Sequence, residues 1–514
     1  MDANADRTPR ILMFSWEFPP RIVGGLSTHV YHLSRSLYRK GADIQLITCD
    51  FPNVSLQEVN GGVRVSRVNS TSIQERDFLL WIYHMNSLMI DRSIEILKNE
   101  TFNVIHAHDW MVGRAALEIK GLYNLPLVTT IHATEIGRNR GSSFHNDFQK
   151  AIHRMEDLLI RHSDGLICCS SYMQKHVESN FNISTNQIDV IHNGVDTLSF
   201  NHTPDIRKAM SEISQRYRIP NGKILLYAGR LVLEKGPDIL IDAFEVLHHE
   251  NPELSLIIVG EGPLKQSLMN KVIRLGLQNR IHFMGFVDQE TLVAIYRSAD
   301  VFVIPSLYEP FGIVALEAMA SGVPVVSSDV GGLSEIVENA VTGLKVPPGD
   351  PQLLASAIRQ VLGVPSLCEF LKINGYEYAL KRYDWDLVAE KTLQTYMRSM
   401  TQKRISGMAS GEKEQIPSVG TAAADEDFFL TDYRLLRLLL TLGITKEESS
   451  KTAREISALL RQSESLIKIV IGRLASLGYI SALIVPSRIN DDFAIDIRYH
   501  LTESGIVSAC SDFS

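Results

Sequence analysis

Two glutamates eight residues apart, Glu309 and Glu317, enclose a segment that can bind an anion. The apolar run 301–306 before them predicts a buried strand, and from Gly312 onward apolar residues recur at helical spacing. The first peptide N–H groups of such a helix lack internal partners and lie at the positive end of its dipole, so they can bind a phosphate or an oxygen-rich ring. The flanking carboxylates can accept hydrogen bonds from hydroxyls. This arrangement predicts a sugar-nucleotide site; the alternative is two surface glutamates beside an ordinary helix.

Arg230 and Lys235 place two cations five residues apart in the loop that follows another predicted strand, 224–228. An arginine fork and a compact lysine charge can hold the two sides of a diphosphate, and both stabilise oxyanions best where water is scarce. When a glycosidic bond to a diphosphate breaks, negative charge builds on the departing phosphate, so these contacts strengthen in the transition state. This cationic turn (Arg230 and Lys235) is therefore predicted to be catalytic. Alone, the same stretch would be read as an exposed turn.

Polar clusters also follow two predicted strands of the N-terminal half. Asp109 lies in HAHDW and His132 in TIHATE. Three histidines and two acids in these clusters raise the alternative of a metal site, but no two of them have a recognised ligand spacing on one element, so no metal is expected. His106 and His108 are expected to be core histidines.

The segment EPFGIVALE resembles the E-x7-E element of retaining glycosyltransferases that have the two-domain GT-B architecture. That large family includes sucrose synthases, many mannosyl- and glucosyltransferases and some glycogen synthases. The resemblance implies that Glu309 contacts the transferred sugar and Glu317 the ribose. It also implies that the backbone N–H groups of Phe311, Gly312 and Ile313 contact the sugar and phosphate.

The same resemblance implies roles for the other residues. The cationic turn would bind the donor phosphates, His132 would reach the transferred sugar, and Asp109 would meet donor or acceptor hydroxyls. Gly262 and Phe286, in the loops after two later strands, would lie near the nucleobase. The donor would be a nucleoside diphosphate sugar, with no cofactor and no metal. No base–nucleophile pair of the double-displacement kind stands out, so retention by front-face attack is expected, with the leaving phosphate oxygen taking the acceptor proton.

Gly24 and Gly25 lie in the loop after the first strand, where a backbone without side chains can approach the donor phosphate. The surrounding SWEFPP and GGLSTHV resemble the opening of glucan-synthase-like members. Two departures favour the broader family: Ile22 stands where bacterial glycogen synthases carry a lysine, and Glu317 stands where they lack a second glutamate. Glucose is favoured as the transferred sugar, and the base and the acceptor stay open.

Strand and helix patterns alternate twice, which predicts an α/β protein with two Rossmann-like domains that face a shared cleft. The resemblance extends over about residues 9 to 400. The expected organisation comprises an N-terminal, acceptor-side domain, a C-terminal nucleotide-sugar domain, a helix that crosses back to the first domain, a linker and a small tail domain. Their expected bounds are 9–200, 201–382, 383–401, 402–424 and 425–514.

The tail domain resembles a winged helix, because helical patterns at 428–442, 452–460 and 464–477 precede a two-stranded ribbon. Such a domain can read DNA, which gives an alternative function: a sugar-nucleotide-sensing regulator that uses the tail for DNA or partner binding. Ten basic and thirteen acidic residues lie between 425 and 514, whereas a duplex-binding module has a basic face. Packing or oligomerisation through the tail is therefore favoured over nucleic-acid binding.

Composition sets the remaining expectations. The 514 residues are 45% hydrophobic, enough for two or three cores, and 51 basic against 59 acidic residues give a net charge of −8, which disfavours a polyanionic partner. Five scattered cysteines and an N-terminus without a signal segment fit a cytoplasmic protein. No transmembrane segment is expected. Peripheral membrane contact through 78–90 is an alternative to a helix packed on the first domain, and the packed helix is favoured.

Overall fold

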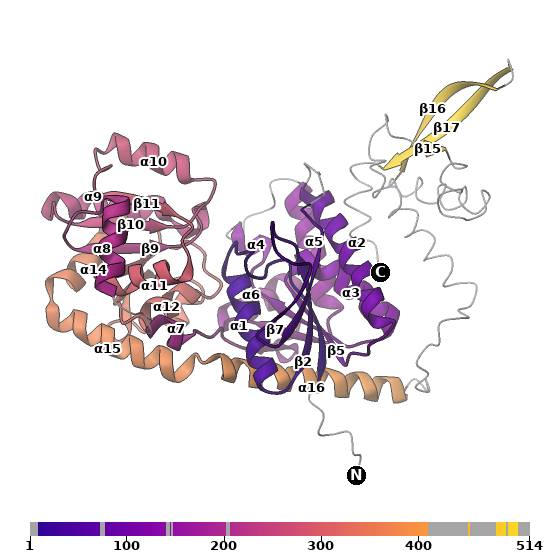
Figure 1. The fold of residues 1–514 in the computed structure, drawn as a ribbon, viewed down its shortest axis with the longest axis horizontal. Coiled ribbons are helices and arrows are strands. Elements are labelled where there is room, and N and C mark those ends of the chain that lie inside the picture. The colour runs from indigo at the N-terminus through magenta and orange to yellow at the C-terminus, as the bar shows by residue number, and fades with distance from the viewer. Residues whose placement is uncertain are drawn as a thin grey trace, which may run out of the picture.

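The computed structural model describes residues 9–71, 78–139, 144, 147–201, 206–409, 451–452, 480–489 and 492–501. Two sheets covered by helices form two lobes, shown in indigo to magenta and in magenta to orange in Figure 1. The α/β class with two Rossmann-like sheets is therefore confirmed.

The first lobe contains an eight-stranded sheet in the order β3-β4-β2-β1-β5-β6-β7-β8, parallel except for the edge strand β3. Its strands are β1 (Arg10–Phe14), β2 (Asp43–Cys49), β3 (Gln57–Asn60), β4 (Val63–Val68), β5 (Val104–His108), β6 (Leu127–Ile131), β7 (Gly165–Cys168) and β8 (Ile188–Val190). Its helices are α1 (Gly25–Arg39), α2 (Phe78–Leu97), α3 (Gly113–Tyr123), α4 (Glu135–Arg138), α5 (Asp147–Arg161) and α6 (Ser171–Phe181). Central strands such as β5 are buried along their whole length, because helices cover both faces.

The second lobe contains a six-stranded parallel sheet in the order β11-β10-β9-β12-β13-β14. Its strands are β9 (Ile224–Ala228), β10 (Ser255–Val259), β11 (Ile281–Gly285), β12 (Val301–Ile304), β13 (Val325–Ser328) and β14 (Gly343–Val346). Its helices are α7 (Thr197–Asn201), α8 (Ile206–Tyr217), α9 (Pro237–Glu250), α10 (Lys265–Arg274), α11 (Gln289–Ser298), α12 (Ile313–Ala320), α13 (Leu333–Ile336), α14 (Pro351–Gly363) and α15 (Pro365–Arg382). The strand order reverses between β9 and β12, and ligands of such sheets bind beyond the carboxyl ends of the strands at this point.

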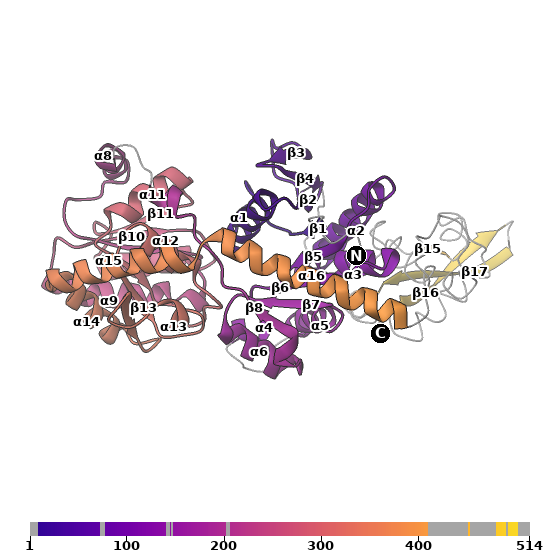
Figure 2. The same cartoon turned by 90° about the horizontal axis from the view of Figure 1, so that it is seen from below.

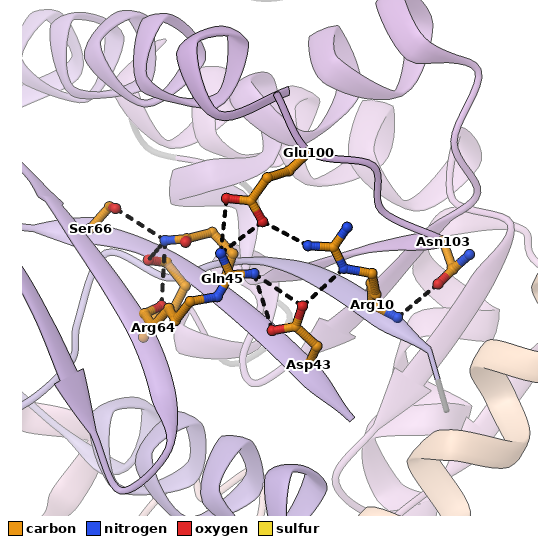
Figure 3. Close-up of polar contacts among 8 residues, drawn as sticks. Arg10, Asp43, Gln45, Arg64, Ser66, Glu100 and Asn103 are labelled. Atoms are coloured by element: carbon orange, nitrogen blue, oxygen red, sulfur yellow. Dashed lines mark hydrogen bonds and ion pairs between the residues drawn. The ribbon is translucent and has the colours of Figure 1, made fainter. Parts of the chain in front are cut away.

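The amino ends of the strands in the first sheet, opposite the ends where such sheets bind ligands, hold a network of charged side chains. Arg10 and Arg64 both contact Asp43 and Glu100, with N–O distances of 2.7 to 3.1 Å (Figure 3). Asp43 is the first residue of β2 and Arg10 the first of β1, so these charges lie at the amino ends of the strands. The network ties neighbouring strands together on the side away from the predicted site.

Helix α16 (Trp385–Ala409) leaves the second lobe and packs along the first, as Figures 1 and 2 show. Asp384 accepts a hydrogen bond from the Asp386 N–H at 2.6 Å, so it caps the start of the helix as its sequence position predicts. The helix continues to Ala409, past the end expected near residue 401. The first residues of the expected linker are therefore helical, because 402–409 contains no proline and only one glycine, Gly407.

A buried hydrogen bond joins α16 to the first sheet: the Tyr396 hydroxyl lies 2.6 Å from His106 Nδ1. Both residues are fully buried, which confirms the expectation of a core role for His106. We expect Tyr396→Phe to lower the free energy of unfolding by roughly 1–2 kcal/mol, because it leaves a buried imidazole nitrogen without its partner. Chemical denaturation measures the difference. Tyr38→Phe, at an exposed position on α1, is the control, and equal stabilities for the two variants would contradict this role.

Part of the predicted tail lies within the described residues. Strands β16 (Ile480–Ile489) and β17 (Asp492–Leu501) form an antiparallel hairpin, and the short strand β15 (Lys451–Thr452) pairs with β17. The two-stranded ribbon is thus confirmed, whereas the three helical patterns of the tail lie outside the described residues.

Among the described residues, no single helix is long and apolar enough to cross a bilayer. One helix pair, 351–363 with 365–405, reaches that length and apolar character only when it is joined across a 97° bend.

Candidate functional site

The two motifs of the second lobe form one site. The Lys235 ammonium lies 2.6 Å from Glu309 Oε2, although 74 residues separate them in the chain. The backbone oxygen of Glu234 accepts hydrogen bonds from the N–H groups of Leu307 and Tyr308 at 2.8 and 3.1 Å. These contacts fix the loop after β9 against the loop after β12, at the carboxyl edge of the sheet.

Glycine is required where these loops meet. Gly236 has a φ of 61°, and a Cβ there would lie 2.2 Å from the Pro305 carbonyl oxygen. A left-handed backbone without a side chain lets the turn close against the neighbouring loop, and Pro237 then starts α9. Local geometry therefore explains the glycine that follows Lys235.

Glu309 is buried, with 7% of its surface exposed, and its carboxylate also accepts a hydrogen bond from the Ser306 hydroxyl at 3.2 Å. The Lys235 side chain is 18% exposed. The ion pair neutralises both buried charges.

Arg230 completes the cationic turn from a more open position. Its guanidinium lies 3.1 Å from the Glu234 carboxylate and is 40% exposed. The Tyr227 hydroxyl donates to the Arg230 carbonyl oxygen at 2.8 Å, which fixes the backbone of this residue while the fork stays accessible.

The start of α12 has the geometry expected for an anion site. Gly312 precedes the helix with a φ of 105°, and no side chain caps the first N–H groups of the helix. A Cβ at Gly312 would lie 2.6 Å from Leu333 Cδ2, so a larger residue would displace this turn. Phe311 is buried and offers only its backbone, whereas the helix begins at Ile313.

Glu317 lies about one turn into α12, where the Tyr296 hydroxyl donates to its carboxylate at 2.9 Å. Its surroundings raise the pKa of Glu317 from its ordinary value to about 7, because burial disfavours the charged form. Glu317 therefore exists as a mixture of neutral and charged forms near neutral pH in the absence of a ligand.

This shift predicts a pH dependence of stability. The folded chain binds the Glu317 proton more tightly than the unfolded chain, so its stabilising effect is present at low pH and is lost as the pH rises through about 7. We expect the free energy of unfolding of the natural protein, relative to Glu317→Gln, to fall by about 1–3 kcal/mol between pH 5 and pH 8. Urea unfolding at each pH measures it. Glu369→Gln, at an exposed position, is the control; a pH-independent difference for Glu317→Gln would contradict the expectation.

The loops that contain Gly262 and Phe286 border the cationic turn. The Leu231 N–H donates to the Glu261 carbonyl oxygen at 2.9 Å, and the Gly260 N–H donates to the Gly285 carbonyl oxygen at 2.9 Å. Phe286 is 65% exposed. These loops form the neighbouring part of the same sheet edge.

In the first lobe, Asp109 and His132 are brought together. The His132 N–H donates to Asp109 Oδ1 at 2.7 Å. Asp109 has a φ of 62°, an uncommon value for a residue with a side chain, and such strain often marks functional positions. Burial raises the pKa of Asp109 to about 6.

Glu17 organises the loop that contains Gly24 and Gly25 (the glycine loop). The sequence did not predict it as a site residue. Its carboxylate accepts hydrogen bonds from the N–H groups of Val23 and Gly24 at 2.8 and 3.0 Å. Burial raises the pKa of Glu17 to about 7, and the charge of Arg230 in the other lobe opposes that rise. A lone glutamate in a loop of proline and aromatic residues gives no sequence signal of this role.

The two lobes contact each other beside the site. A Cβ at Gly25 would lie 3.4 Å from Ile313 Cδ1, so the glycine loop faces the start of α12. The Ser170 hydroxyl donates to the Pro310 carbonyl oxygen at 2.6 Å. Glu335 accepts hydrogen bonds from the N–H groups of Ser171 and Tyr172 at 3.0 and 2.7 Å. The predicted residues of both lobes therefore lie on facing surfaces.

Histidines at this edge of the first lobe come closer together than their sequence positions indicate. His29, His108 and His132 each offer a ring nitrogen, and these atoms lie within 4.8 Å of one another. They belong to three different elements, so no ligand spacing within one element could have revealed them. His108 is completely buried, as expected.

Comparison with known proteins extends over both lobes. Residues 210–378 match the model of Glycosyl transferases group 1, and residues 23–198 match that of Glycosyltransferase Family 4. An uncharacterized glycosyltransferase of Methanocaldococcus jannaschii is 38% identical over 396 residues, which cover 76% of this chain and 98% of the relative. A glycogen synthase of Mycobacterium tuberculosis is 35% identical over 409 residues, or 77% of this chain and 96% of the relative.

A solved structure has the same arrangement of lobes. Sucrose-phosphate synthase from Thermosynechococcus elongatus is 26% identical and gives a TM-score of 0.67, with 77% of this chain and 100% of that structure covered. The chain therefore belongs to the Glycosyl transferases group 1 family and has the GT-B architecture.

Proposed function

We propose that the protein is a retaining hexosyltransferase that moves glucose from a nucleoside diphosphate sugar to a hydroxyl of a carbohydrate acceptor. The single observation that carries this proposal is the contact of Lys235 with Glu309, because the cation proposed to bind phosphate lies next to the carboxylate proposed to bind the sugar. The glycogen synthase at 35% identity and the sucrose-phosphate synthase at 26% identity support glucose as the transferred sugar.

In the proposed reaction the diphosphate binds between the cationic turn and the first N–H groups of α12. The bond from the sugar C1 to the phosphate oxygen breaks, and its electron pair stays on the phosphate. The acceptor hydroxyl oxygen forms the new bond to C1 on the same face, and its proton passes to the leaving phosphate oxygen. Arg230 and Lys235 stabilise the charge that develops on this oxygen, while Glu309 and His132 orient the sugar. No step uses a metal.

An aromatic surface beside Asp109 supports a carbohydrate acceptor. Phe78 lies 6.1 Å from Trp81, 6.5 Å from Trp110 and 6.0 Å from Phe148, measured between ring centroids. Phe78 and Phe148 are 43% and 41% exposed. The electron-rich faces of such rings attract the C–H groups of a pyranose, and the rings are rigid contacts that lose little entropy on binding.

The test is a transfer assay with a panel of nucleotide sugars that differ in base and sugar, combined with glucose oligomers, sugar phosphates and inositol phosphate as acceptors. Thermal shift identifies the donors that bind, because a ligand that binds only the folded state raises Tm. NMR of the product determines the anomeric configuration. We expect transfer of glucose with retention. An inverted product would contradict the mechanism, and binding of donors without transfer to any acceptor would contradict the proposed activity.

A further inference from the structure

Three histidines converge from separate elements at the carboxyl edge of the first sheet. His29 lies in α1, His108 ends β5 and His132 follows β6. Their ring centroids are 4.6 Å apart for His29 and His132, 5.2 Å for His29 and His108, and 5.5 Å for His108 and His132. Among the His, Cys, Asp and Glu side chains of the described residues, these three imidazoles form the cluster without a carboxylate or thiol ligand.

The hydrogen bonds of the cluster leave two nitrogen atoms without partners. His29 Nδ1 lies 2.7 Å from the Asn193 side-chain oxygen, which can only accept, so Nδ1 carries the hydrogen and Nε2 carries a lone pair. Within the described part of the chain, this Nε2 is buried and has no hydrogen-bond partner. The same holds for His108 Nε2, while His108 Nδ1 lies 3.2 Å from His132 Nε2.

Buried nitrogen atoms without partners are costly unless another group satisfies them. Histidines that bind metals usually donate their second ring N–H to a carbonyl or carboxylate oxygen, which is the arrangement of His29 and Asn193. Three neutral imidazoles are ligands for Zn²⁺, whereas Mg²⁺ and Ca²⁺ prefer oxygen atoms.

We propose that His29, His108 and His132 bind one Zn²⁺ ion. Zinc–nitrogen bonds of about 2.0–2.1 Å in tetrahedral geometry place ligand atoms about 3.3 Å apart. The ligand atoms here lie within 4.8 Å, so they approach one another by at most about 1.5 Å on binding.

Zinc binding at this cluster would affect glycosyl transfer, an inference that rests on the proposed function. His132 is the residue proposed to orient the transferred sugar, and a zinc-bound imidazole is no longer free to do so. Zinc and the donor sugar therefore compete for the same side chain, and zinc acts as an inhibitor, not as a cofactor of the transfer.

The experiment measures binding directly, with the full chain freed of metal and without any nucleotide sugar. Co²⁺ serves as a spectroscopic probe whose visible absorption reports tetrahedral coordination, and Zn²⁺ is titrated against a chromophoric chelator. We expect saturation at one equivalent. We expect His29→Gln and His108→Gln to weaken binding at least about 100-fold, and Asn193→Ala, which removes the partner of His29, to weaken it about 10-fold.

His162→Gln and His249→Gln, at exposed positions, are matched controls that keep the affinity. Circular dichroism verifies that each variant is folded. No saturable binding by the natural protein would overturn the proposal, and so would unchanged affinity in folded His29→Gln and His108→Gln. Since no donor or acceptor is present, this result is independent of the transfer assay, and either proposal can fail while the other holds.

Discussion

Lys235→Ala lowers kcat/KM for glycosyl transfer by roughly 10² or more, and we expect Arg230→Ala to do the same. Both side chains lie in one loop at the carboxyl end of β9, and they act on a charge that is larger in the transition state than in the bound donor. The loss should therefore appear mainly in kcat. Steady-state kinetics with the donor found by the panel, at saturating acceptor, measures it.

The matched control is Lys381→Ala. Lys381 forms an ion pair with Glu377 at 2.7 Å on the exposed face of α15, so this variant also removes a lysine from a lysine–glutamate pair, but away from the site. It should keep the activity of the natural protein. Unchanged turnover in both Lys235→Ala and Arg230→Ala would exclude the cationic turn from the mechanism.

Glu309→Gln is expected to lower kcat/KM by about 10² as well. The amide keeps the shape of the side chain but removes the charge that holds Lys235 and the acceptor lone pairs that a sugar hydroxyl requires. Because the pair is buried, Tm should fall too, since Lys235 then lacks its counter-charge. Kinetics and thermal unfolding of the same preparation separate the two effects.

Glu377→Gln, the other half of the exposed pair, is the control for this variant and should change neither quantity. If Glu309→Gln lowers Tm but keeps kcat/KM within about twofold of the natural protein, Glu309 supports the loop without taking part in transfer.

Local sequence signals predicted the elements around the site well. Strand β9 and helix α9 have the expected starts, because an apolar run ends at a glycine and Pro237 marks the first turn of the helix. The predicted end of α16 is too early, since most residues of 401–409 are polar or small, as in a linker, yet five of them, Gln402, Lys403, Arg404, Met408 and Ala409, have good helix propensity.

Local sequence signals could not predict contacts between segments that lie far apart in the chain. The ion pair of Lys235 and Glu309 depends on the pairing of β9 with β12. The strand order determines this pairing, and the spacing of residues along the chain does not reveal it. Glu17 acquires its role by turning back onto the glycine loop. His29 lies in α1, whereas His108 ends β5 and His132 follows β6, so only the fold brings the three histidines together. The family resemblance named many of the residues, and the fold shows how they meet.

The most direct test of the account is a crystal structure of the protein with its nucleoside diphosphate sugar. We expect phosphate oxygens within hydrogen-bond distance of the Arg230 guanidinium, the Lys235 ammonium and the N–H groups at the start of α12, with the sugar beside Glu309. A diphosphate bound elsewhere, with the cationic turn and the start of α12 both in contact only with solvent, would contradict it.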